Sequence, residues 1–295
     1  MKPSRYGPFP YTPISRRPKI VWPKGARLAL WVIPNIEFFP LDERMPDGPG
    51  GSGGLIPDVL TWAPRDYGNR VGIWRMMDVM ARRGVRGTVA LNSEICDAHP
   101  EIIDEAKRLG WEFMGHCQSN VRRLNRLPEG TEREVVRATL ERIAAATGRK
   151  VAGWLGSGLQ ETWNTLDYLA EFGCKYVADW VNDDQPYVMD VGGGRRLCSI
   201  PYSAEINDKV AIEYHHVTPE EFERMIRRQF EVLYREGERS GRVMAIALHP
   251  YITGVPHRID ALDRALKFVA SQDKVWLATG EEIVDHYMKQ GGAAK

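Results

Sequence analysis

The chain has 295 residues, and its 40 Lys and Arg against 39 Asp and Glu leave a formal charge of +1, which excludes the basic excess of a non-specific nucleic-acid binder. Its 43% hydrophobic and 27% charged residues are typical of a globular protein and not of a disordered one. Four cysteines without a CxxC pair, no apolar run of roughly 18 residues and no signal-peptide core together predict a cytoplasmic protein without a membrane segment.

Short apolar runs bounded by glycine or polar residues predict buried strands along the chain. Between most of them lie segments with helical periodicity, such as the one that carries Val71, Trp74 and Met77 on one face and ends at Gly84. The predicted strands lie at about 27–33, 85–91, 111–115, 151–155, 175–180, 197–202, 243–248 and 275–279. Three helix starts have capping-box spacing, namely Thr131 with Glu134, Thr218 with Glu221, and Thr279 with Glu282.

Strands that alternate with helices predict a parallel sheet, because parallel neighbours need a crossover connection. No linker, repeat or shift in composition divides the sequence, so we expect one catalytic domain over residues 1–295 with an N-terminal extension at 1–20. The expected fold class is α/β, closed into a barrel or a distorted barrel. The Gly/Pro-rich loop insertion at 45–57 is either a lid over one barrel mouth or a plain surface insertion.

Polar side chains follow several predicted strands, at the end where such barrels place their reactive groups. Asn35 and Glu37 follow the first strand, and Asn92 follows the second. His116 follows the third strand, and His249 follows the strand at 243–248. Each could alone be a structural residue, but no GxGxxG, P-loop or GxSxG motif offers a competing chemistry. The sequence therefore predicts that these strand ends meet in one active site.

Taken in order, the strand ends resemble the polysaccharide deacetylase superfamily (carbohydrate esterase family four), and more closely its branch of purine-utilisation type allantoinases and cyclic imide hydrolases. The resemblance runs from about residue 22 to residue 287, and its most specific motifs lie at 153–154, 179–187, 200–202, 207–208 and 248–250. It implies a distorted (β/α) barrel of about seven parallel strands. It also implies a homo-oligomer, a dimer or a tetramer, for which an apolar helix at 218–236 is a candidate surface.

The sequence departs from the family pattern where the family binds its metal. The family's two aspartates after strand one read here as Asn35 and Glu37, and its His-x-x-x-His pair reads as His116 and Asn120. An Asp-His-His triad thus becomes Glu37, His116 and Asn120, and a neutral amide oxygen is a weak zinc ligand. We therefore expect no obligatory cofactor, with a weakly bound divalent metal at these three residues as the alternative.

The resemblance implies a hydrolase of C–N bonds in a small cyclic amide, which would be an imide, a ureide such as allantoin, or a lactam. Glu37 is the expected base with His116 as its partner, and His249 is the expected acid. The loop at 156–158 or the Asn92 amide would stabilise the oxyanion. The expected substrate-binding residues are Asn35, Asn92, Trp154, Trp180, Asn182, Asp183, Tyr187 and Asn207.

Two other functions stay open. The first is a metal-dependent N-deacetylase of polysaccharide or peptidoglycan, which needs an open groove and a bound divalent ion. The second is a pseudoenzyme that binds a small ligand without turnover, suggested by Asn35 and Asn120.

Overall fold

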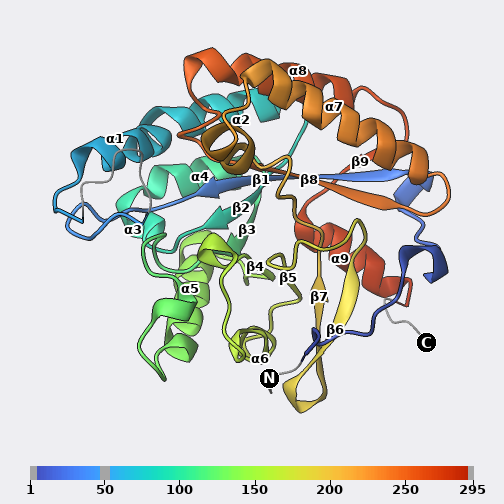
Figure 1. Cartoon of the computed structure of the whole chain (residues 1–295), viewed down its shortest axis with the longest axis horizontal. Coiled ribbons are helices and arrows are strands. Elements are labelled where there is room, and N and C mark those ends of the chain that lie inside the picture. The colour runs from blue at the N-terminus through green and yellow to red at the C-terminus, as the bar shows by residue number, and fades with distance from the viewer. Residues whose placement is uncertain (1–4, 47–53, 292–295) are drawn as a thin grey trace.

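The computed structural model describes residues 5–46 and 54–291, in which nine strands form a curled sheet (Figure 1). Neighbouring strands follow the order β6-β7-β5-β4-β3-β2-β1-β8, and β9 pairs with β1. All of these pairings are parallel except that of β6 with β7. The strands are β1 (Leu28–Ile36), β2 (Thr88–Leu91), β3 (Glu112–Gly115), β4 (Gly153–Trp154), β5 (Tyr176–Val177), β6 (Tyr187–Val191), β7 (Arg195–Ser199), β8 (Arg242–Leu248) and β9 (Val275–Leu277).

Helices cover the outside of this sheet, which confirms the predicted α/β fold of distorted-barrel type. In Figure 1, α2, α7 and α8 lie over the β1–β8 part of the sheet, and α5 and α6 lie beside β4 and β5. The helices are α1 (Val59–Tyr67), α2 (Ile73–Arg82), α3 (Ile95–Ala98), α4 (Pro100–Arg108), α5 (Glu132–Thr147), α6 (Thr165–Glu171), α7 (Pro219–Glu236), α8 (Pro256–Ala270) and α9 (Gly280–Lys289). None of the helices in the described ranges is long and apolar enough to cross a membrane.

One strand was not expected, so the sheet is mixed and not wholly parallel. β6 pairs antiparallel with β7 from Tyr187–Ser199 to Val191–Arg195. The turn between them contains Gly193 and Gly194, which adopt φ of +72° and +69°. Glycine reaches this left-handed region at little cost, so the sequence closes a hairpin between β6 and β7.

All three helices begin directly after the predicted capping residue, but the side-chain cap forms at only two of them. Thr279 and Glu282 form a complete capping box at α9, and the Thr218 hydroxyl accepts from the Glu221 amide at 3.2 Å at the start of α7. At α5 the box does not form, because the Thr131 hydroxyl donates to the carbonyl of Pro128 at 2.7 Å. α5 therefore begins directly after Thr131, as predicted, but the Thr131 side chain does not cap the helix.

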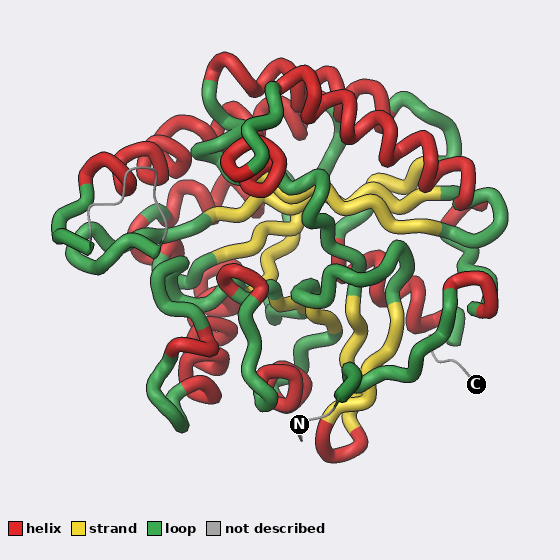
Figure 2. The backbone as a smooth tube through the Cα atoms, viewed as in Figure 1, coloured by secondary structure: helices red, strands yellow, loops and turns green. Residues whose placement is uncertain are grey.

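The free edge of β8 is covered by irregular segments and not by a further strand. The Val243 amide donates to the Asp184 carbonyl at 3.0 Å, and the Ala247 amide donates to the Ile206 carbonyl at 3.3 Å. Figure 2 shows long strands at β1 and β8 and loops between the short strands around β4 and β5. These segments bring the connection after β7 alongside the end of β8.

Two predictions concern the surface, namely the oligomer surface on α7 and the lid at 45–57. The apolar face of α7 is buried within the chain through Phe222, Ile226 and Phe230, so it offers no apolar face to a second copy, and the homo-oligomer stays a prediction. Residues 47–53 of the predicted 45–57 lid lie outside the described residues, so the lid also stays a prediction.

Candidate active site

Glu37 directly follows β1, and the end of that strand is held from three sides. The Asn69 amide donates to the Glu37 carbonyl at 2.9 Å, and the Asn120 backbone amide donates to the Phe38 carbonyl at 3.0 Å. The Asn92 side chain accepts from the Phe38 amide at 2.8 Å. The carboxylate is 5% exposed, so its orientation is set by the protein and not by solvent.

His116 directly follows β3 and faces this carboxylate. Its Nδ1 lies 2.6 Å from the Leu155 carbonyl oxygen, which can only accept, so Nδ1 carries the proton. Its Nε2 lies 3.7 Å from Glu37 Oε1. Cys117, the next residue, adopts φ of +59°, a strained conformation for a residue with a side chain. The strained turn aims the His116 ring into the site.

His249 directly follows β8 and approaches Glu37 from the other side. Its Nε2 lies 3.7 Å from the same Glu37 Oε1, and its Nδ1 lies 2.7 Å from Asp208 Oδ1. The buried Asp208 carboxylate also accepts from the His249 amide at 2.8 Å and from the Thr253 hydroxyl at 2.6 Å. Asp208 therefore fixes the imidazole and favours its charged form.

Asn120 completes the wall around Glu37. Its side-chain amide donates to Glu37 Oε1 at 2.8 Å, so its Oδ1 faces the opposite way. Asn120 Oδ1 and Glu37 Oε2 are both buried without a hydrogen-bond partner in the described part of the chain. Buried acceptors of this kind are costly unless a ligand or water supplies the donor.

The charges of this cluster are coupled. Burial would raise the pKa of Glu37, but the charge of His249 and the contacts with His116 outweigh it and hold the pKa at about 2. For His249, burial would lower the pKa, but Asp208 and Glu37 raise it above its usual value. The site therefore favours an ionised carboxylate beside a protonated imidazole.

The donor set does not fit a tightly held metal. Within the described residues, no three His, Cys, Asp or Glu side chains group as metal ligands. Asn120 could contribute only an amide oxygen, and its amide group already donates to the carboxylate that would share the ion. A weakly bound divalent metal at Glu37, His116 and Asn120 stays a prediction.

Two further predicted residues, Asn35 and Asn207, lie beside this cluster. The Asn35 amide donates to the Leu248 carbonyl at 3.2 Å, and both asparagines reach the Tyr202 hydroxyl at 3.5 Å. The Asn92 amide donates to the His116 carbonyl, so its side chain bridges the ends of β1 and β3. Asn92 thus has structural contacts, and its role with substrate stays a prediction.

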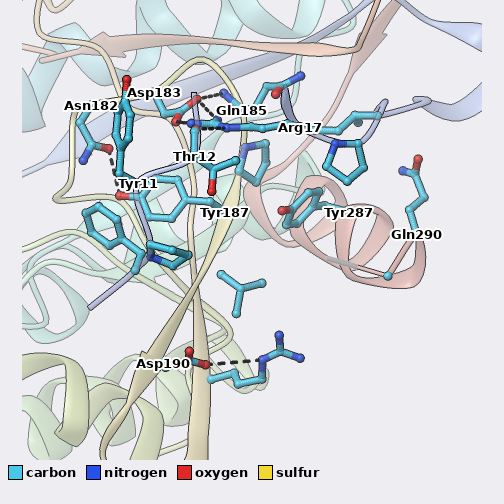
Figure 3. A pocket seen from close by; sticks show the side chains of 18 of the residues that line it. Tyr11, Thr12, Arg17, Asn182, Asp183, Gln185, Tyr187, Asp190, Tyr287 and Gln290 are labelled. Atoms are coloured by element: carbon cyan, nitrogen blue, oxygen red, sulfur yellow. Dashed lines mark hydrogen bonds and ion pairs between the residues drawn. The ribbon is translucent and has the colours of Figure 1, made fainter. Parts of the chain in front are cut away.

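Other predicted substrate residues lie elsewhere. Asn182, Asp183 and Tyr187 line a cavity of about 630 Å³ between the N-terminal segment, β6 and α9 (Figure 3). There Asp183 pairs with Arg17 at 2.6 Å, and the Tyr187 hydroxyl donates to Asn182 at 2.9 Å. These interactions anchor the N-terminal segment, and within the described part of the chain none of them joins the three residues to Glu37.

The two predicted tryptophan walls also have other surroundings. Trp154 is fully buried in the core, where a Cβ added at Gly115 would lie 2.6 Å from its ring. The Trp180 indole donates to Glu161 at 3.2 Å, and its ring meets Phe9 edge-on at 5.4 Å. Core packing therefore encloses Trp154, whereas Trp180 is partly exposed, and its role with substrate stays a prediction.

Residue types alone missed several members of the site. Asp208 stands in the Asn-Asp pair after β7, and its chemistry follows from the contact with His249 41 residues away. Lys209 directly follows Asp208, and Tyr251 lies two residues after His249, so their positions in the sequence indicated that they lie near the site. Such long-range pairings need the register of the segment beside β8, which periodicity does not give.

Comparisons with known proteins concern the family and the fold of this chain. Residues 60–177 match the family described as "Polysaccharide deacetylase". A curated Schizosaccharomyces pombe protein named "Putative polysaccharide deacetylase" is 26% identical over 234 residues, which cover 74% of this chain and 73% of that protein. The crystal structure of a "probable Polysaccharide deacetylase" from Pseudomonas aeruginosa PAO1 is 26% identical with a TM-score of 0.83, covering 94% of this chain and 96% of the other.

The crystal structure of "Puue Allantoinase" has the same fold. It superposes with a TM-score of 0.84 at 24% identity, covering 95% of this chain and 96% of the other. At this identity the likeness concerns the fold alone.

Proposed function

From the polysaccharide deacetylase domain that this chain carries, we propose that the protein is a hydrolase of carbon–nitrogen bonds whose substrate is a small cyclic amide, an imide, ureide or lactam. The family relationship supports the bond class. The observation that supports a cyclic amide as substrate is the geometry of the site. Glu37 Oε1 lies 3.7 Å from both His116 Nε2 and His249 Nε2, and Asn120 replaces a strong metal ligand.

Water attack begins on the carboxylate side of the site. Glu37, ionised at neutral pH, takes one proton of the attacking water while His116 orients the carboxylate. The new C–O bond forms as the carbonyl pair moves onto oxygen and gives a tetrahedral oxyanion. A carboxylate with a pKa of about 2 is a weak base, so Glu37 keeps this proton only until a stronger base can receive it.

His249 becomes that base in the second step. As the C–N bond breaks, His249 gives its Nε2 proton to the leaving nitrogen and becomes neutral. The His249 charge is the foremost cause that lowers the pKa of Glu37, so its loss makes Glu37 more basic at that moment. The proton held on Glu37 then returns to His249, and the ring has opened to a carboxylic acid and an amine or amide.

A panel of cyclic amides tests this function. Succinimide, hydantoin, allantoin and a simple lactam are assayed with wild-type protein, with and without a chelator and added divalent ions. We expect ring opening of at least one compound at a rate that the chelator does not reduce. Absence of turnover, together with thermal shifts by these rings, would instead indicate the ligand-binding pseudoenzyme.

A metal-dependent deacetylase is the second candidate, and one observation favours it. Glu37 Oε2 and Asn120 Oδ1, which have no hydrogen-bond partner among the described residues, could coordinate a divalent ion beside His116. This function predicts activity on acetylated sugars, loss of that activity with a chelator, and its recovery with zinc. Stoichiometric metal after purification would also support it.

A further inference from the structure

One side of the Glu37 site carries hydrogen-bond donors that the proposed chemistry does not yet use. Lys209 directly follows Asp208, and Tyr251 lies two residues after His249. The Lys209 ammonium donates to the Tyr251 hydroxyl at 3.1 Å and to the Glu213 carboxylate at 2.8 Å. The Tyr251 ring lies 5.7 Å from the His249 ring, so the pair is adjacent to the group assigned as acid.

Each member of this pair keeps one donor for a ligand. An ammonium has three N–H groups, and Lys209 uses two of them. The Tyr251 oxygen accepts from Lys209, and its own O–H has no acceptor among the residues the structure describes. The Lys209 side chain is 18% exposed, so a ligand from solvent can reach it.

Both groups hold the protonation state that donates. Burial alone would lower the pKa of Lys209, but Tyr251, Glu37 and Glu213 raise it, so the ammonium persists. Burial and the charge of Glu37 raise the pKa of Tyr251, so its hydroxyl stays protonated. Since Glu37 acts on both, Lys209 and Tyr251 lie within the electrostatic field of the site.

Two of the donors expected from the sequence for an oxyanion are already engaged. The Gly156 amide donates to Asp179 at 2.7 Å, and the Asn92 side-chain amide donates to the His116 carbonyl. The unpartnered oxygens of Glu37 and Asn120 are acceptors and would repel an anionic oxygen. Lys209 and Tyr251 lie on the other side of the site and have donors available for a ligand oxygen.

We propose that Lys209 and Tyr251 together bind an anionic oxygen of the ligand. Its source is either the oxyanion formed by water attack or a carboxylate that the substrate already carries. The inference rests on the proposed function and adds the recognition chemistry of its site: acceptors at Glu37 and Asn120 for ligand N–H groups, and a donor pair for ligand oxygen.

Tyr251→Phe and Lys209→Met test the pair in steady-state kinetics. If the oxygen is the oxyanion, Tyr251→Phe lowers kcat by about 10²–10³ with KM unchanged. If it is a substrate carboxylate, KM rises with kcat unchanged, and only for compounds that carry a carboxylate. Tyr214→Phe is the matched control, because the Tyr214 ring also lies near Lys209 Nζ, at 5.4 Å, but its side chain is exposed.

A binding measurement separates this inference from the proposed function. If no ring in the panel is opened, the proposed function fails, and acetate is used as the probe in thermal unfolding. We expect acetate, against chloride at equal ionic strength, to raise the Tm of wild type and of Tyr214→Phe but not of Lys209→Met. Kinetic constants of Tyr251→Phe within about threefold of wild type, or no acetate effect that depends on Lys209, would overturn the inference.

Discussion

The imidazole of His249 lies between two carboxylates, and this placement decides what one residue can do. Asp208 holds Nδ1 at 2.7 Å, and Nε2 faces Glu37 at 3.7 Å. A histidine held in this way has one nitrogen for positioning and one for proton transfer. We expect His249→Ala to lower kcat by about 10²–10⁴ on the best cyclic amide of the panel.

The control for this variant is His286→Ala, a partly exposed histidine on α9 whose ring contacts Trp22 and Trp276. Circular dichroism of both variants checks that they fold. A near-normal rate in folded His249→Ala would remove this residue from the chemistry.

Asp208 sets the pH range in which His249 can act. Because Asp208 and Glu37 raise the pKa of His249 above its usual value, the acid loses its proton at a higher pH than a free imidazole, and kcat falls on the alkaline side of that pKa. Glu37, with a pKa of about 2, gives no acid limb near neutrality. We expect Asp208→Asn to move the alkaline limb of the kcat profile to lower pH, measured between pH 5 and 10.

An unchanged limb in folded Asp208→Asn would show that another group titrates there. The matched control is Thr253→Val, which removes a hydrogen bond to the same carboxylate and leaves its charge. This control should leave the direction of the His249 pKa shift intact.

The residues that sequence reasoning found share one property: they end predicted strands. Glu37, His116 and His249 were found because strand ends of a barrel meet on one face. Asn182 and Asp183 also follow a strand and Tyr187 begins β6, but these residues line a cavity beside the N-terminal segment, where Arg17 pairs with Asp183. The position of a residue after a strand therefore predicts on which face of the sheet it lies. The packing of distant segments decides whether its side chain can contact a ligand.

At the scale of elements, a close crossing positions the loop that carries His249. The π-helical turn η3 (Gly68–Gly72), between α1 and α2, packs against residues 250–254. A Cβ at Gly72 would lie 2.1 Å from the Pro250 carbonyl oxygen, and a Cβ at Gly254 would lie 2.5 Å from the Gly72 oxygen. Two glycines thus permit backbone contact next to the site.

We expect Gly72→Ala to destabilise the fold by about 1–3 kcal/mol, because the backbone must move to admit the methyl group. Urea denaturation measures the loss, and the kcat of the folded variant should fall as the 249–254 loop shifts. Arg70→Ala is the control on the same turn, since that side chain is 72% exposed. Equal stability of Gly72→Ala and wild type would contradict the close backbone contact between Gly72 and Pro250.

The elements were predicted well where periodicity is strong and poorly where it is short. β8 and α7 match their predicted ranges to within a few residues, because apolar runs and caps mark them. β1 continues through Pro34 to Ile36, beyond the predicted end. β4 and β5 have two residues each, so their neighbours and not their own sequences define them.

At the scale of the whole molecule, buried acids make stability depend on pH. Glu161 lies against Asp179, and burial together with the Asp179 charge raises the pKa of Glu161 above its usual 4.5. A group whose pKa is raised on folding adds stability below its unfolded pKa, and this stability is lost as pH rises. The pair should therefore weaken the fold progressively above about pH 4.5.

We expect Glu161→Gln to reduce the fall in Tm between pH 5 and pH 9, because the amide needs no proton to donate to Asp179. Differential scanning calorimetry at both pH values measures the difference. Glu134→Gln, a carboxyl exposed on α5, is the control and should leave the fall unchanged. The same fall in Glu161→Gln and wild type would show that this pair does not govern alkaline stability.

The irregular cover on the outer edge of β8 has a consequence for how the chain can vary in length. The Ile206 carbonyl meets the Ala247 amide at 3.3 Å, and this single register places Asp208 opposite His249. Residues inserted at the glycine turn of the β6–β7 hairpin would extend it into solvent and leave the site intact. One residue inserted between Tyr202 and Asp208 would separate the acid from its carboxylate, so homologous chains should tolerate insertions at the first place and not at the second.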